Sequence, residues 1–238
     1  MKNFFLLVAL IFTGLSGLFS QETLKKKPID LSNRANDHLV LQVGYARWTS
    51  VPDTISMGNF SKTFNIYFML DKPFKSNPKM SIGIGAGIGS DHIHFNKVNI
   101  GIKEGGNTFP FTNVRDTNHF KKSKLATTYL EIPLELRYSA NPETGKGFKF
   151  ALGFKAGTLF NAHTRNAKLE NRNGTLINDY VLKESSTRFI NKTRFAATAR
   201  VGYGHFSLFT SVQLNPTIRD GFGPKVKPFS IGLTLSGL

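Results

Sequence analysis

Acidic and basic residues recur at even-numbered spacings in two neighbouring segments of the chain. Glu131, Glu135 and Arg137 lie in the first segment, and Lys149 and Lys155 lie in the second. Because successive residues of a β-strand point to opposite sides, each set shares one face if the segments are strands. Paired carboxylates could act as a general acid and base, and a row of charges could line an ion path. Opposite charges on neighbouring strands could equally form structural ion pairs.

The residues between these segments, 139–146, are typical of a tight turn, so the two strands should form a hairpin. One register of that hairpin places Glu131 opposite Lys155. A register shifted by two residues places Glu135 opposite Lys149. We predict structural ion pairs in a closed interior, where an unpaired charge is costly. The predicted charge network comprises Glu131, Glu135, Arg137, Lys149, Lys155, Arg194 and Arg200.

Two further groups have spacings that could support chemistry. Asp91, His92 and His94 form a weak candidate metal site, in which the two imidazoles share a strand face and need a third ligand. His205 and Ser207 have the spacing of a histidine that activates a serine, but no acidic residue follows in the same strand to orient the histidine. We therefore expect no bound metal, no cofactor, no catalytic residue and no enzymatic activity.

The elements that position these residues are strands, because apolar residues alternate with small or polar ones along most of the chain. The alternation is clearest over residues 60–70 and 80–89, and the second stretch carries glycine at four alternate positions. No stretch after residue 20 has the roughly 18 to 20 apolar residues of a transmembrane helix. The expected strands are 38–48, 60–70, 80–91, 125–138, 147–160, 190–203, 205–214 and 227–237.

Alternation alone does not say whether the apolar face points outward or inward, so the volume of the interior decides. Eight strands enclose little more space than their own inward side chains fill. The apolar face carries too many large residues for that space, whereas the glycines at 83–89 suit a narrow lumen. The sequence predicts an all-β fold, an eight-stranded antiparallel up-and-down transmembrane β-barrel over residues 38–238. Aromatic residues near the outer ends of the strands should lie at the boundary between membrane and water. They are Tyr45, Trp48, Phe60, Phe95 and Phe160.

The beginning of the chain indicates export. Lys2 precedes an apolar run and then small residues, which predicts a signal peptide over 1–20 that is cleaved before Gln21. Residues 21–37 are polar and basic and should form a short periplasmic leader. The chain has no cysteine, which excludes disulfides and a lipidated N-terminal cysteine. We expect the protein in the outer membrane.

The connections alternate between short and long, and the long ones are basic. Outer-membrane barrels have short periplasmic turns and long external loops, which makes 92–124 and 161–189 external here. The formal net charge is +16, yet no nucleic-acid motif accompanies it, so we expect no nucleic-acid partner. The basic residues either lie in solvated loops or contact phosphorylated lipid head groups, including those of lipopolysaccharide.

The segment Thr128-Tyr129-Leu130-Glu131-Ile132-Pro133-Leu134-Glu135-Leu136-Arg137-Tyr138 resembles the "YLEIP" strand of the bacteroidete-type outer-membrane β-barrel proteins, often called PorT-like. The glycine repeat at 83–89, residues 200–204 and residues 227–233 support the resemblance. It implies an eight-stranded barrel in the outer membrane. It does not imply one function, because most members of the family are uncharacterised. The member from which the name PorT-like comes belongs to a protein-secretion and gliding apparatus.

The leading functional hypothesis is a non-enzymatic outer-membrane barrel. Its body would anchor it in outer-membrane lipid, and its basic external loops would serve surface interaction or envelope integrity. The alternative is a PorT-like component of a secretion or gliding apparatus, with an envelope or secretion-machinery protein as partner, or a narrow transport pore. An enzyme that acts on lipid is a third hypothesis.

Overall fold

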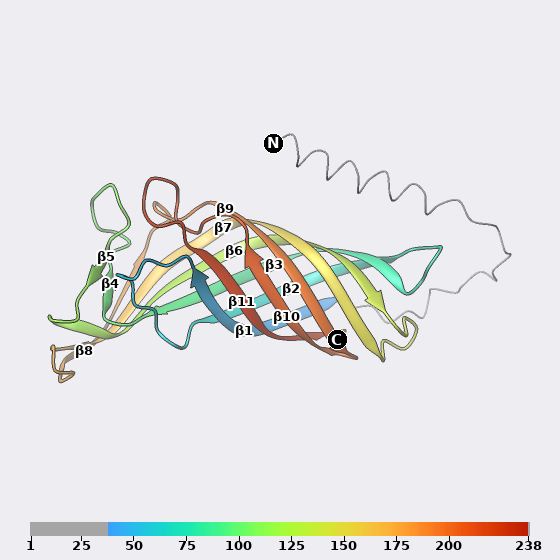
Figure 1. Ribbon diagram of the computed structural model, residues 1–238, viewed down its shortest axis with the longest axis horizontal. Helices are drawn as coiled ribbons and strands as arrows, with labels where there is room; N and C mark the ends of the chain where they lie inside the picture. The colour runs from blue at the N-terminus through green and yellow to red at the C-terminus, as the bar shows by residue number, and fades with distance from the viewer. Residues whose placement is uncertain (1–37, 238) are drawn as a thin grey trace. The chain divides into compact units, whose positions relative to one another are not determined.

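The computed structural model describes residues 38–237 (Figure 1), so the predicted signal peptide 1–20 and leader 21–37 lie outside the described residues. No helix within the described part of the chain is long and apolar enough to cross a membrane. The strands are β1 (Leu39–Thr49), β2 (Lys62–Pro73), β3 (Met80–Phe95), β4 (Val98–Ile100), β5 (Phe111–Asn113), β6 (His119–Ser139), β7 (Phe148–Glu170), β8 (Leu176–Ser185), β9 (Thr193–Tyr203), β10 (Phe206–Gln213) and β11 (Lys227–Ser236).

Eight of these strands close into a ring. Their order around it is β1, β2, β3, β6, β7, β9, β10 and β11, and β11 pairs with β1 to complete it. Each strand is antiparallel to both of its neighbours in the ring. The predicted fold, an eight-stranded antiparallel up-and-down barrel, is therefore confirmed. Outside the ring, β8 pairs with β7, and β4 pairs with β5.

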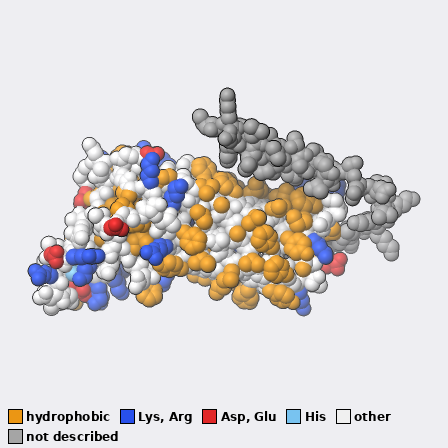
Figure 2. All heavy atoms as spheres, viewed as in Figure 1, with side chains coloured by type: hydrophobic (Ala, Val, Ile, Leu, Met, Phe, Trp, Pro, Cys, Tyr) orange, Lys and Arg blue, Asp and Glu red, His pale blue; other side chains and the backbone are white. Residues whose placement is uncertain are grey.

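The wall of the barrel is apolar outside and polar inside. On β6, the side chains of Leu130, Ile132, Leu134 and Leu136 are between 44% and 59% exposed, whereas the alternate residue Glu131 is 2% exposed. We call the large exposed apolar side chains on and beside the ring strands the apolar belt. Figure 2 shows them spread over the barrel wall. Such a large exposed apolar surface fits contact with lipid.

The two ends of the barrel differ. The turn end carries the short connections 74–79, 140–147 and 204–205. The loop end carries the longer connections and the small strands β4, β5 and β8, and many lysines and arginines gather there in Figure 2. Both β6, with 21 residues, and β7, with 23 residues, exceed the roughly 9 to 11 residues that a membrane crossing needs. They continue past the apolar belt toward the loop end.

Two segments expected to be loops therefore contain strands. Within 92–124, β3 continues to Phe95, β6 begins at His119, and β4 and β5 form a small hairpin. Within 161–189, β7 continues to Glu170 and β8 forms a hairpin with it. The reason is that backbone pairing continues above the belt, where neither face contacts lipid and the apolar alternation that reveals a strand is lost.

A hydrophobic core fills the loop end of the barrel. Trp48 and Phe95, expected at the exposed membrane boundary, are instead 3% and 4% exposed, with ring centroids 5.4 Å apart. They point inward from β1 and β3 and pack with residues of the loop-end connections, such as Phe109, Phe189 and Ile218. This loop-end core joins side chains from opposite sides of the ring and covers the interior.

Candidate functional site

The inward positions of β6, β7 and β9 carry the charged residues of the barrel interior. Glu131 on β6 lies 3.1 Å from Lys155 Nζ on β7 and 3.3 Å from Arg194 Nη1 on β9. Tyr67 on β2 donates a hydrogen bond from its hydroxyl to Glu131 Oε2 at 2.5 Å. Arg194 also reaches across the interior to Asp91 on β3, with 2.6 Å between Nη2 and Oδ2. The Glu131 carboxylate thus links β6 to β2, β7 and β9.

A second group lies closer to the turn end. Glu135 Oε2 accepts hydrogen bonds from Arg137 Nε at 2.8 Å and from Arg200 Nη2 at 2.6 Å. Arg137 Nη1 lies 3.6 Å from Asp71 Oδ1. Both glutamates are therefore shared between two cations. We call the two groups together the lumen network; its members are Asp71, Asp91, Glu131, Glu135, Arg137, Lys155, Arg194 and Arg200.

The lumen network is electrically balanced, because its four acidic members face four basic ones. Each buried charge has an opposite charge within 3.6 Å, as a closed interior requires. Two glycines of β3 make room for it. A Cβ at Gly89 would lie 2.5 Å from Glu131 Oε2, and a Cβ at Gly83 would lie 2.6 Å from Arg137 Nε. Gly83 and Gly89 therefore allow close packing against charged side chains.

The observed hairpin register differs from both expected registers. Tyr138 pairs with Phe150, so Lys155 lies opposite Pro133, and Lys149 lies opposite Ser139. Lys155 still reaches Glu131 because it extends diagonally to the next inward position of β6. Both expected registers were wrong because the connection lies at 140–147 and not at 139–146, and a displacement of one residue changes the pairing by two positions. The connection includes two glycines with positive φ, Gly145 and Gly147.

Of the predicted charged residues, the structure joins six in the lumen network, and Lys149, half-buried at the turn end, lines a pocket beside Arg137 and Arg200. The prediction missed three members of this interior. On β2, Tyr67 and Asp71 lie an even number of residues after the inward-facing Asn65, so they share its face. On β3, Asp91 lies an even number of residues after the glycines at 83–89, so it also points inward. Extending the alternation of inward and outward side chains to both ends of each strand would have identified all three residues.

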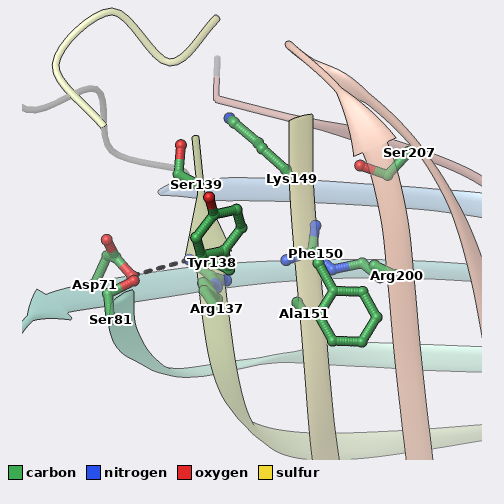
Figure 3. A pocket seen from close by; sticks show the side chains of 10 residues that line it. All are labelled: Asp71, Ser81, Arg137, Tyr138, Ser139, Lys149, Phe150, Ala151, Arg200 and Ser207. Carbon is green, nitrogen blue, oxygen red and sulfur yellow. Dashed lines mark ion pairs between the residues drawn. The ribbon is translucent and has the colours of Figure 1, made fainter. Parts of the chain in front are cut away.

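A small pocket opens beside the second group at the turn end (Figure 3). Its volume is about 30 Å³, which is room for a water molecule or a small ion and too little for an organic substrate. Asp71 and Arg137 face one another across one side, and Lys149 lies on the strand beside them. The pocket is lined by Asp71, Ser81, Arg137, Tyr138, Ser139, Lys149, Phe150, Ala151, Arg200 and Ser207.

The structure separates the residues of the candidate metal site. Asp91 points into the lumen, where it pairs with Arg194, whereas His92 and His94 lie on the outer side of the same strand. Within residues 38–237, no three His, Cys, Asp or Glu side chains converge to hold a metal ion. His205 Nδ1 donates to the backbone carbonyl of Ser236 at 3.0 Å, and Ser207 is buried on the inner side of β10.

A closed eight-stranded ring with an apolar exterior and charged residues inside defines an outer-membrane β-barrel protein. A family model described as "Outer membrane protein beta-barrel domain" matches residues 19–223, and the chain belongs to this family. The match confirms the expected outer-membrane β-barrel family and supports the outer-membrane location. No curated protein matches the chain.

Proposed function

We propose that the protein is a non-enzymatic membrane anchor that presents its loop end to a partner protein at the cell surface. The observation that carries this proposal is the hairpin of β7 and β8, which projects beyond the ring. Within residues 38–237, β8 pairs with β7 along one edge and with no strand along the other. An unpaired strand edge is a template for a strand from another chain.

The side chains of β8 strengthen this proposal. Nine of its ten residues are exposed, and they include large apolar ones away from the apolar belt. Exposed apolar residues outside a membrane mark a surface for another protein. The exposed apolar residues of β8 are Leu176, Ile177, Tyr180, Val181 and Leu182.

The orientation is part of the proposal. The turn end has three short connections, as periplasmic ends of outer-membrane barrels do, so the loop end would face outward. Cleavage of residues 1–20 during export belongs to the same proposal. The filled interior supports an anchor, because the lumen network and the loop-end core both occupy the space that a pore would need.

Shortening the hairpin tests this function. Replacing residues 168–180 by a two-residue turn should preserve membrane insertion but remove cross-linking to the partner and weaken the envelope. A matched control replaces 103–108, which lie in another loop-end connection. Heat-modifiable gel mobility reports insertion, and detergent sensitivity of cells reports envelope integrity. Unchanged cross-links and unchanged detergent sensitivity in the hairpin variant would contradict the proposal.

A PorT-like role in a secretion or gliding apparatus is the second candidate, and the unpaired edge of β8 favours it as well. It differs in the partner, which would belong to the secretion machinery, and in the phenotype. Deleting the gene should then block the export of secreted proteins while envelope integrity is kept. Normal secretion in the deletion strain would exclude this role.

A further inference from the structure

Basic side chains form a continuous row on the outer wall of the barrel, where the apolar belt gives way to the loop end. His94 on β3 pairs with Lys124 on β6, Lys124 pairs with Arg165 on β7, and Arg165 pairs with Lys183 on β8. Lys62 on β2 pairs with His92 beside them. We call these six residues the basic row: Lys62, His92, His94, Lys124, Arg165 and Lys183.

Within residues 38–237, the lysines and the arginine of the basic row form no ion pair with an acidic side chain. These four cations are Lys62, Lys124, Arg165 and Lys183. Lys124 Nζ instead donates to an imidazole nitrogen, His92 Nδ1, at 3.2 Å. The other three cations lie close enough to Lys124 to repel its ammonium group. Like charges directly opposite one another destabilise a sheet, so this arrangement favours an anion bound from outside.

A groove connects the basic row to the apolar belt. It has a volume of about 340 Å³, and its basic lining residues are Lys62, His92, His94 and Lys124. Thr63 and the exposed apolar side chains of Val43, Phe60 and Phe64 complete the lining. The groove is therefore amphipathic and opens on the surface that faces lipid.

We propose that this groove binds a phosphorylated lipid of the surrounding leaflet. The phosphate contacts the basic row, and an acyl chain lies against Val43, Phe60 and Phe64. A lipid satisfies both halves of the groove, because its charged head group and its apolar chain meet at the same boundary as the basic row and the belt. The site uses neither the unpaired edge of β8 nor a partner protein, and a hairpin variant that keeps Lys183 leaves the basic row complete, so the two proposals can be tested separately.

The length of the basic row indicates the class of head group. From His94 to Lys183 it crosses four adjacent strands. Three spacings between strands amount to about 14 Å. A single phosphate contacts two or three donors, so a row of this length suits a head group that carries two phosphates. Diphosphoryl lipid A has this chemistry and is the probe for the test.

The test measures lipid binding to the full-length barrel in detergent by native mass spectrometry. The row variant combines Lys62→Gln, Lys124→Gln and Arg165→Gln. The control variant combines Lys72→Gln, Lys75→Gln and Lys79→Gln, which removes the same charge from exposed lysines at the turn end. The row variant should bind diphosphoryl lipid A on the order of 100-fold more weakly, because each basic residue near a lipid surface contributes roughly fivefold. The control should bind as the wild type does.

Three results would overturn the proposal: equal affinity of the row and control variants, equal affinity of the wild type for dephosphorylated lipid A, or displacement of the lipid by an equal concentration of inorganic phosphate. The last result would make free phosphate the ligand. Heat-modifiable mobility shows whether each variant is folded. If the triple variant fails to fold, the single variants Lys124→Gln and Arg165→Gln should each lose about fivefold in affinity. No loss in either single variant would contradict the site.

Discussion

Glu131 contacts Lys155, Arg194 and the Tyr67 hydroxyl while it is 2% exposed. The two positive charges and the hydroxyl group stabilise the negative charge of Glu131, as water would at an exposed site. The alternation of β6 predicted that Glu131 points inward, but the identity of its partners depends on the register. The connection between β6 and β7 sets that register, and its positive-φ glycines are not visible as a register signal in the sequence.

Replacing Glu131 with glutamine should destabilise the barrel strongly. The change leaves Lys155 and Arg194 buried without the charge that they share, and breaking a buried pair costs about 3–5 kcal/mol. Urea unfolding of the barrel in lipid vesicles measures the free energy of unfolding. Glu143→Gln is the control, because Glu143 is exposed at the turn end and should change stability by less than about 0.5 kcal/mol. Similar losses in the two variants would show that the charge is not needed.

The glycine repeat gives a second prediction at this scale. A Cβ at Gly87 would meet the backbone carbonyl oxygen of Ile66 at 2.0 Å and the ring of Tyr67 at 2.6 Å. Gly87→Ala should therefore cost about 1–3 kcal/mol through displaced backbone and a displaced Tyr67 hydroxyl. Gly105→Ala is the matched control, since nothing lies within 4 Å of a Cβ there. The same urea titration compares the two, and equal stability would contradict the packing role.

At the scale of elements, β6, β7 and β8 form a structure that rises past the apolar belt. The sequence predicted the lower parts of β6 and β7, because one of their faces contacts lipid and is consistently apolar. It did not predict β8 or the upper part of β7, since Leu176 to Leu182 include apolar residues on both faces and alternation is absent. Those strands depend on pairing with a neighbour more than on their own pattern.

The orientation of these elements can be measured directly, because the chain contains no cysteine. Asn173→Cys places a thiol at the tip of the β7–β8 hairpin, and Ser76→Cys places one in a connection at the turn end. A membrane-impermeant maleimide added to intact cells should label the hairpin variant. It should label the Ser76→Cys variant only after the outer membrane is permeabilised. The reverse pattern would place the loop end in the periplasm.

At the scale of the whole molecule, the sequence predicted the ring of eight strands and its inside-out polarity. Counting strands and comparing the two faces were sufficient, because both depend on short-range alternation. The loop-end core was not predicted. Trp48 and Phe95 are aromatic, as residues at a membrane boundary often are. They are buried because distant connections fold over the mouth of the barrel. Such long-range packing leaves no local pattern.

A closed interior predicts the electrical behaviour of the molecule. The lumen network blocks the middle of the barrel, and the loop-end core covers its mouth. We expect the purified protein to insert into a planar bilayer without discrete conductance steps. The control is the buffer and detergent without protein, and heat-modifiable mobility confirms that the inserted protein is folded. Reproducible single-channel steps that scale with protein concentration would contradict a filled lumen.

The pairing of β1 with β11 has a consequence for how the barrel is made. Leu41 pairs with Leu235, so the seam of the ring joins residues that lie almost 200 positions apart in the chain. Each of the other contacts between neighbours in the ring forms within a shorter stretch, but the seam cannot form until β11 has been exported. Until then β1 and the growing edge of the sheet are unpaired, and contacts between such distant residues form slowly. We therefore expect assembly to depend on protection of two open edges until the first strand joins the last.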